Sequence, residues 1–128
     1  MQEFTIYHNP RCSKSRQALA LLEQNGITPS VILYLQTPPS KNELNKLLTQ
    51  LKLSAHDIIR TQEPEYNALK LSQDSTKATL LAAIISTPKL LQRPIVATQY
   101  AAVIARPPEN ILSLININGN PPLNGNPT

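Results

Sequence analysis

In the first third of the chain, apolar residues first alternate with polar ones, then recur at helical spacing, and then form a second short apolar run. Residues 4–8 alternate and are rich in aromatic and β-branched side chains, which predicts a strand. Over residues 12–24 the apolar side chains recur every three or four positions, and Asn25-Gly26 supplies a helix stop. Residues 31–35 then form a second apolar run. The pattern predicts a βαβ unit with its two strands parallel.

The rest of the chain is first helical and then strand-rich. Ser40 and Glu43 have capping-box spacing ahead of a leucine-rich helix. Further predicted elements are short helices over residues 55–60, 63–71 and 75–86, strands over 94–98 and 102–105, and a helix from 107 to 115. The order βαβ, helices, ββα is typical of an α/β protein with a thioredoxin-like fold. We therefore expect a four-stranded mixed sheet flanked by helices, with a helical insertion in the middle.

Length and composition indicate a small globular protein. The chain has 128 residues, of which 41% are hydrophobic and 16% charged, so a single domain over residues 1–115 is expected. Residues 116–128 are dominated by Asn, Pro and Gly, and we expect a disordered tail there. The mid-chain apolar run at residues 80–85 is far shorter than the roughly 20 residues that cross a bilayer. No membrane association is expected.

Net charge and cysteine content indicate which binding partners and which cell compartment to expect. The formal net charge is +4, but the basic residues are scattered and aromatic residues make up only 4%, so we expect no nucleic-acid binding. A mildly basic surface does attract small anions. The single cysteine cannot form an internal disulfide, and the first residues lack the basic and apolar segments of a secretory signal. A cytoplasmic location is the expectation.

Cys12 is the predicted chemical centre. A free thiol has a pKa of about 8.5, and lowering the pKa to about 6.5 would make roughly three-quarters of it thiolate at pH 7. Cys12 lies at the predicted start of a helix, in its first turn, with Arg11, Lys14 and Arg16 nearby and His8 just upstream. Positive charges and a helix N-terminus both favour the thiolate. The free amide groups of a first turn also form a cradle for an anion.

A lone cysteine is often only a small buried side chain. The polar residues around Cys12 favour an exposed helix start instead. Ser15 occupies the place of the second cysteine of a Cys-x-x-Cys pair, so an external thiol has to complete any redox cycle. With one cysteine and two distant histidines, His8 and His56, the sequence shows no metal-ligand spacing. We expect no bound metal or cofactor, and we interpret His56 as a surface residue.

Three arginines each end a predicted element, and their planar guanidinium groups suit a tetrahedral oxyanion. They are Arg60, Arg93 and Arg106, and the last two each precede a proline. In a thioredoxin-like sheet the loop before the third strand faces the start of the first helix. Arg93 would then approach Cys12, and Pro94 is a candidate for a cis peptide bond.

The chain resembles the arsenate reductases that depend on glutathione and glutaredoxin, over about residues 4 to 115. The family's strand-loop-helix signature occurs here from Ile6 to Arg16 as Ile-Tyr-His-Asn-Pro-Arg-Cys-Ser-Lys-Ser-Arg. Three further motifs follow in the family's order: Ile32-Leu33-Tyr34-Leu35 with Thr37-Pro38-Pro39-Ser40, Arg93-Pro94-Ile95-Val96, and Arg106-Pro107. The basic residues around the cysteine are similar to those of chromosomal relatives.

The resemblance implies a thioredoxin-like enzyme in which Cys12 attacks arsenate. It implies that Arg60, Arg93 and Arg106 bind the oxyanion, and that His8 and Ser15 support the thiolate. Glutathione would then act as co-substrate, glutaredoxin would reduce the mixed arsenic-thiol species, and arsenite would leave.

Two other functions are compatible with the same residues. One is a thiol oxidoreductase that acts on another substrate, such as a glutathionylated protein. The other is a redox-responsive regulator that binds RNA polymerase, because such regulators share the fold and much of the N-terminal pattern. Those with a redox switch usually carry Cys-x-x-Cys, and Ser15 argues against that role here.

Overall fold

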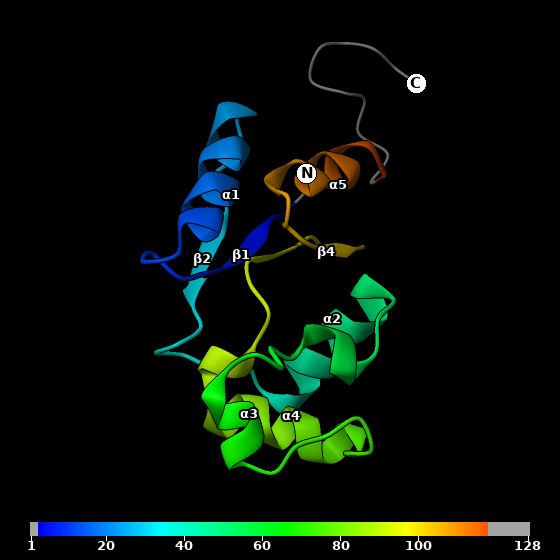
Figure 1. Ribbon diagram of the computed structural model, residues 1–128. Coiled ribbons are helices and arrows are strands. Elements are labelled where there is room, and N and C mark those ends of the chain that lie inside the picture. Colours follow the sequence, from blue (N-terminus) through cyan, green and yellow to red (C-terminus); the bar gives the residue numbers. More distant parts are fainter. Residues whose placement is uncertain (1–2, 118–128) are drawn as a thin grey trace. The chain divides into compact units, whose positions relative to one another are not determined.

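The computed structural model describes residues 3–117, which form two compact units (Figure 1). The first unit combines the described residues up to Ile32 with those from Arg93 onward, and the second is Leu33–Gln92. The elements associated with the first unit are β1 (Thr5–His8), α1 (Ser13–Gln24), β2 (Ser30–Leu33), β3 (Ile95–Ala97), β4 (Ala102–Ile104), the 3₁₀ helix η3 (Pro108–Ile111) and α5 (Leu112–Ile117).

The sheet is four-stranded and mixed, with the order β2-β1-β3-β4. β1 and β3 are antiparallel with Ile6 opposite Val96, and β3 and β4 are antiparallel with Val96 opposite Val103. The parallel pair is therefore β1 with β2, where the N–H of Ser30 donates to the carbonyl of Phe4 at 2.8 Å. This topology confirms the predicted thioredoxin-like fold.

One hydrophobic core joins α1, the sheet and the C-terminal helical segment of the first unit. Ile6 of β1 and Val96 of β3 are fully buried, as are Leu22 of α1 and Ile111 of η3. Burial of a side chain of this size contributes about 1.5–3 kcal/mol. The same packing fixes the start of α1 beside the carboxyl end of β1, where the predicted site begins.

The second unit is the predicted helical insertion. Its elements are α2 (Lys41–Leu51), η1 (Ala55–Ile58), α3 (Pro64–Ala68), α4 (Lys77–Ser86) and η2 (Pro88–Leu90). The capping box before α2 is present, since the N–H of Glu43 donates to Ser40 Oγ at 3.1 Å and the N–H of Ser40 donates to Glu43 Oε1 at 2.9 Å. A short antiparallel bridge pairs Ile59 with Leu91.

Some element boundaries differ from the prediction. The helix expected over residues 55–60 is 3₁₀ and ends at Ile58, because Ile59 adopts an extended conformation. The helix expected over 63–71 ends at Ala68, and Lys70 has a left-handed φ of 59°. The last helix begins as 3₁₀ and runs two residues further than expected, to Ile117. The rest of the expected tail, residues 118–128, lies outside the described residues.

Within residues 3–117, no helix has both the length and the apolar character needed to cross a membrane.

Candidate active site

Cys12 is the N-cap of α1 and has an extended backbone conformation, with φ −93° and ψ 122°. Its N–H donates to the carbonyl of Asn9 at 2.9 Å, and its own carbonyl accepts the N–H of Arg16 at 3.0 Å. The sequence placed Cys12 in the first turn, but the helix begins one residue later, at Ser13. An N-cap side chain lies beside the amide groups of the first turn that have no helical partner.

The half-buried thiol of Cys12 has a pKa below its usual value. Burial is the largest single influence and raises the pKa. It is outweighed by the backbone N–H of Ser15, the charge of Arg93, the backbone N–H of Lys14 and the charge of Arg106, in that order. Neither amide makes a capping hydrogen bond of ordinary geometry to the sulfur, so we interpret their effect as that of oriented dipoles.

The antiparallel β3–β4 hairpin brings Arg93 and Arg106 together. Arg93 precedes β3 and Arg106 follows β4, so the pairing of the two strands puts both at one end of the sheet. Arg106 Nη1 donates to the carbonyl oxygen of Arg93 at 3.3 Å. The Arg93-Pro94 and Arg106-Pro107 peptide bonds are both cis. Two guanidinium groups therefore act on the thiol from positions far away in the sequence.

His8 and Ser15 form a buried hydrogen-bonded pair. His8 Nδ1 lies 2.6 Å from Ser15 Oγ, and Ser15 Oγ also accepts the N–H of Asn9 at 3.0 Å. Burial, followed by the charge of Arg16, lowers the pKa of His8. In a neutral imidazole with its proton on Nε2, Nδ1 accepts a hydrogen bond that the Ser15 hydroxyl donates. The pair ties the end of β1 to the first turn of α1, while the backbone N–H of Ser15 is the group that acts on the sulfur.

Arg16 stabilises the loop before the cysteine. Its Nη1 donates to the carbonyl of Pro10 at 2.8 Å, and the N–H of Arg11 donates to Asn9 Oδ1 at 3.0 Å. Arg11 and Lys14 have exposed side chains. The loop that carries the thiol is thus held from both sides by hydrogen bonds of its own residues.

Arg60 belongs to the second unit and has local partners there. Its Nη2 forms an ion pair with Glu63 Oε2 at 3.0 Å, and its Nη1 lies 3.5 Å from the carbonyl oxygen of Lys89. Lys89 Nζ in turn pairs with Glu63 at 3.4 Å and with Glu65 at 3.2 Å. The structure therefore brings the other predicted site residues together in the first unit and pairs Arg60 with a carboxylate. The sequence pattern does not predict this network, because Arg60 and Glu63 lie outside any helix, where a spacing of three residues does not imply contact.

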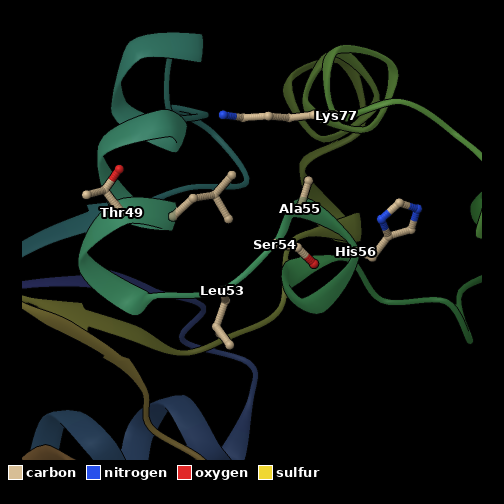
Figure 2. A pocket seen from close by; sticks show the side chains of 7 residues that line it. Thr49, Leu53, Ser54, Ala55, His56 and Lys77 are labelled. Atoms are coloured by element: carbon tan, nitrogen blue, oxygen red, sulfur yellow. The ribbon is translucent and has the colours of Figure 1, made fainter.

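A hollow of about 370 Å³ lies in the second unit (Figure 2). Thr49, Leu53, His56 and Lys77 are among its lining residues. Figure 2 shows the Lys77 side chain extending from the start of α4 toward α2. His56 is half-buried rather than a plain surface residue, and its Nε2 has no hydrogen-bond partner in the part of the chain that the structure describes. The wall offers no thiol or paired carboxylates, so we assign no chemistry to this hollow.

No group of three or more His, Cys, Asp or Glu side chains suited to a metal ion occurs between residues 3 and 117. The groups that the structure gathers around Cys12 are backbone amides, two arginines and a buried histidine–serine pair. Such a set can stabilise a thiolate and bind an anion beside it.

Comparisons with known proteins show which family the chain resembles in sequence and fold. The chain is 44% identical over 116 residues to the uncharacterized protein YfgD of Escherichia coli K12, covering 89% of this chain and 98% of that protein. It is 44% identical over 117 residues to an arsenate reductase of Neisseria meningitidis, covering 90% of this chain and all of the relative. The structure of an arsenate reductase from Vibrio cholerae superposes with a TM-score of 0.84 at 46% identity, covering 88% and 97% of the two chains. The model of the ArsC family matches residues 7–114, and the chain belongs to that family.

Proposed function

We propose that this protein reduces arsenate to arsenite, with Cys12 as the nucleophile. The observation that carries the proposal is the lowered pKa of the Cys12 thiol at the start of α1, together with the two arginine charges that contribute to it. Thiolate and bound oxyanion are both negative, and cations beside the sulfur reduce their repulsion. The arsenate reductases among the relatives support arsenate as the oxyanion.

The reaction balances with one protein thiol and two outside thiols. The Cys12 sulfur bonds to arsenic and one arsenate oxygen leaves as water, after which a glutathione sulfur replaces a second oxygen in the same way. A glutaredoxin thiolate then attacks the glutathione sulfur. The two sulfurs become a disulfide, and the As–S electron pair stays on arsenic as As(III). Water hydrolyses the remaining Cys12–arsenic bond, which releases arsenite and restores the thiol.

Arg93 and Arg106 are the proposed oxyanion ligands in the first unit. A role for Arg60 in binding the oxyanion stays a prediction of the family resemblance. His8 and Ser15 hold the loop so that the sulfur stays beside the first-turn amides. The cycle needs a reduced Cys12 and a supply of thiols, so we place the protein in the cytoplasm. Because Cys12 is the only cysteine in the sequence, the cycle needs outside thiols. The resemblance to glutathione- and glutaredoxin-dependent reductases makes glutathione and glutaredoxin the proposed donors.

The test is arsenate turnover by the full chain with glutathione and glutaredoxin. Cys12→Ser should abolish it, and Arg93→Ala and Arg106→Ala should each raise KM for arsenate by about tenfold or more, from about 1.5–3 kcal/mol per charge-assisted contact. Lys46→Gln removes an exposed charge from α2 and serves as the matched control. Turnover that survives Cys12→Ser would refute the proposal.

A companion assay separates an arsenate reductase from a general thiol oxidoreductase. The same arginine variants are tested for reduction of a glutathionylated protein. A dedicated oxyanion site predicts that thiol-disulfide exchange falls less than arsenate reduction, whereas equal losses in both reactions would argue against it.

A further inference from the structure

A groove of about 440 Å³ lies between α1 and the segment that follows β4. Its wall includes Lys14 and Gln17 on one side and Pro107 and Glu109 on the other. Lys14 follows Cys12 by two positions, and its backbone N–H acts on the thiol. Pro107 directly follows Arg106, whose charge also acts on the thiol. Both walls therefore continue from the residues that surround the sulfur.

The residues that line the groove include apolar side chains, amides and two opposite charges. Ala20, Leu21 and the two prolines supply apolar surface, and Gln17 and Gln24 supply amides. Lys14 and Glu109 are exposed, and neither forms an ion pair with another described residue. A cationic and an anionic side chain in one groove, neither of which forms an ion pair with another described residue, suit a ligand that carries both a carboxylate and an ammonium group.

We infer that this groove binds the outside thiol as a zwitterionic thiol peptide. Its carboxylate would lie at Lys14, its ammonium group at Glu109, and its sulfur toward Cys12. The inference rests on the proposed function only in requiring an outside thiol, which the single cysteine of the sequence demands. Lys14 and Glu109 then determine specificity for the co-substrate, whereas the arginines bind the oxyanion.

Binding is measured first without arsenate, by NMR titration of the Cys12→Ser protein with S-methylglutathione, which cannot react. Chemical-shift changes are expected at Gln17, Gln24 and Glu109. Lys14→Gln and Glu109→Gln should each weaken binding about threefold to tenfold, a range typical of solvent-exposed to partly desolvated charge pairs. Lys46→Gln on α2 is the matched control and should stay within twofold.

A second ligand tests the role of Glu109 even if the variants alter the groove. N-acetyl-S-methylglutathione lacks the ammonium group. The Cys12→Ser protein should bind it more weakly than S-methylglutathione, and the protein carrying Glu109→Gln in addition should bind the two ligands equally. A preference for the free amine that survives Glu109→Gln would overturn the inference.

Steady-state kinetics separate this inference from the proposed function. With Cys12 present, Lys14→Gln should raise KM for glutathione while leaving KM for arsenate within twofold. Shift changes confined to other surfaces, or equal increases in both KM values, would refute the groove. Binding in the groove without any arsenate turnover would instead refute the proposed function alone.

Discussion

Replacing Ser15 with alanine removes one oxygen atom that serves two buried partners. Ser15 is fully buried, and its hydroxyl lies 2.6 Å from His8 Nδ1 and 3.0 Å from the backbone nitrogen of Asn9. Alanine fits the same space but leaves both groups unpaired. An unsatisfied buried donor or acceptor costs about 1–3 kcal/mol, and Asn9 is only part-buried, so a total loss of about 2–3 kcal/mol is expected. For a chain of this length that loss lowers Tm by about 7–11 °C.

The pKa and the alkylation rate of the Cys12 thiol should change much less than the free energy of unfolding does. The group of Ser15 that lowers the Cys12 pKa is the backbone N–H, which alanine retains. We therefore expect the rate of Cys12 alkylation at pH 7 to stay within about twofold of the parent protein while the start of α1 is intact.

Chemical denaturation and iodoacetamide alkylation, measured on the same samples, test both statements. Ser13→Ala is the matched control, because Ser13 is an exposed residue of the same turn, and its effect should stay within about 0.5 kcal/mol. Unchanged stability together with a tenfold slower alkylation would refute the reasoning. The hydroxyl would then act on the sulfur directly.

Three further predictions concern the charge, the pH response and the core of the first unit. Arg106→Ala should raise the pKa of Cys12 and slow its alkylation at pH 7 by about 1.5-fold to fivefold, the range expected for an exposed charge that contributes about 0.2–1 kcal/mol, and an unchanged rate would contradict the assigned charge effect. Burial lowers the pKa of His8 in the folded state, so the unfolded state binds the proton at a higher pH than the folded state does. The free energy of unfolding should therefore fall as pH drops from 7.5 through about 6.5 and below. This pH dependence should disappear in His8→Asn. Leu22→Ala should lower the free energy of unfolding in urea by about 2–5 kcal/mol, because Leu22 of α1 is fully buried in the core, and a loss below 1 kcal/mol would contradict the described core.

Local signals were sufficient for the order of elements. Alternation over residues 4–8, helical spacing to Gln24 and the Ser40 capping box each correspond to an observed element. The boundaries were harder to predict, because they depend on the backbone dihedral angles of single residues. Cys12 is extended and caps α1 instead of starting it, and Lys70 turns left-handed just beyond the end of α3. Nothing in residue type alone distinguishes these conformations from helical ones.

The site was predictable as a set of residues but not as an arrangement. The motif around Cys12 identified the nucleophile, yet the arginine charges that lower its pKa come from Arg93 and Arg106. Their proximity depends on the register of a β hairpin, which sequence spacing does not give. The ion pair of Arg60 with Glu63 spans a turn, and its formation depends on local backbone geometry that the sequence pattern does not give.

The wide separation of Cys12 from the β3–β4 hairpin has a consequence for the newly made protein. Ribosomes add about 5–20 residues per second, so Cys12 leaves the ribosome several seconds before Arg93 and Arg106 are synthesised. Until the hairpin forms, the thiol lacks both of those cations and is mostly protonated, as an ordinary thiol is. A protonated thiol resists oxidation. The nascent chain thus carries its nucleophile without the two arginine charges that lower its pKa, and these charges act only after the β3–β4 hairpin has been made and folded.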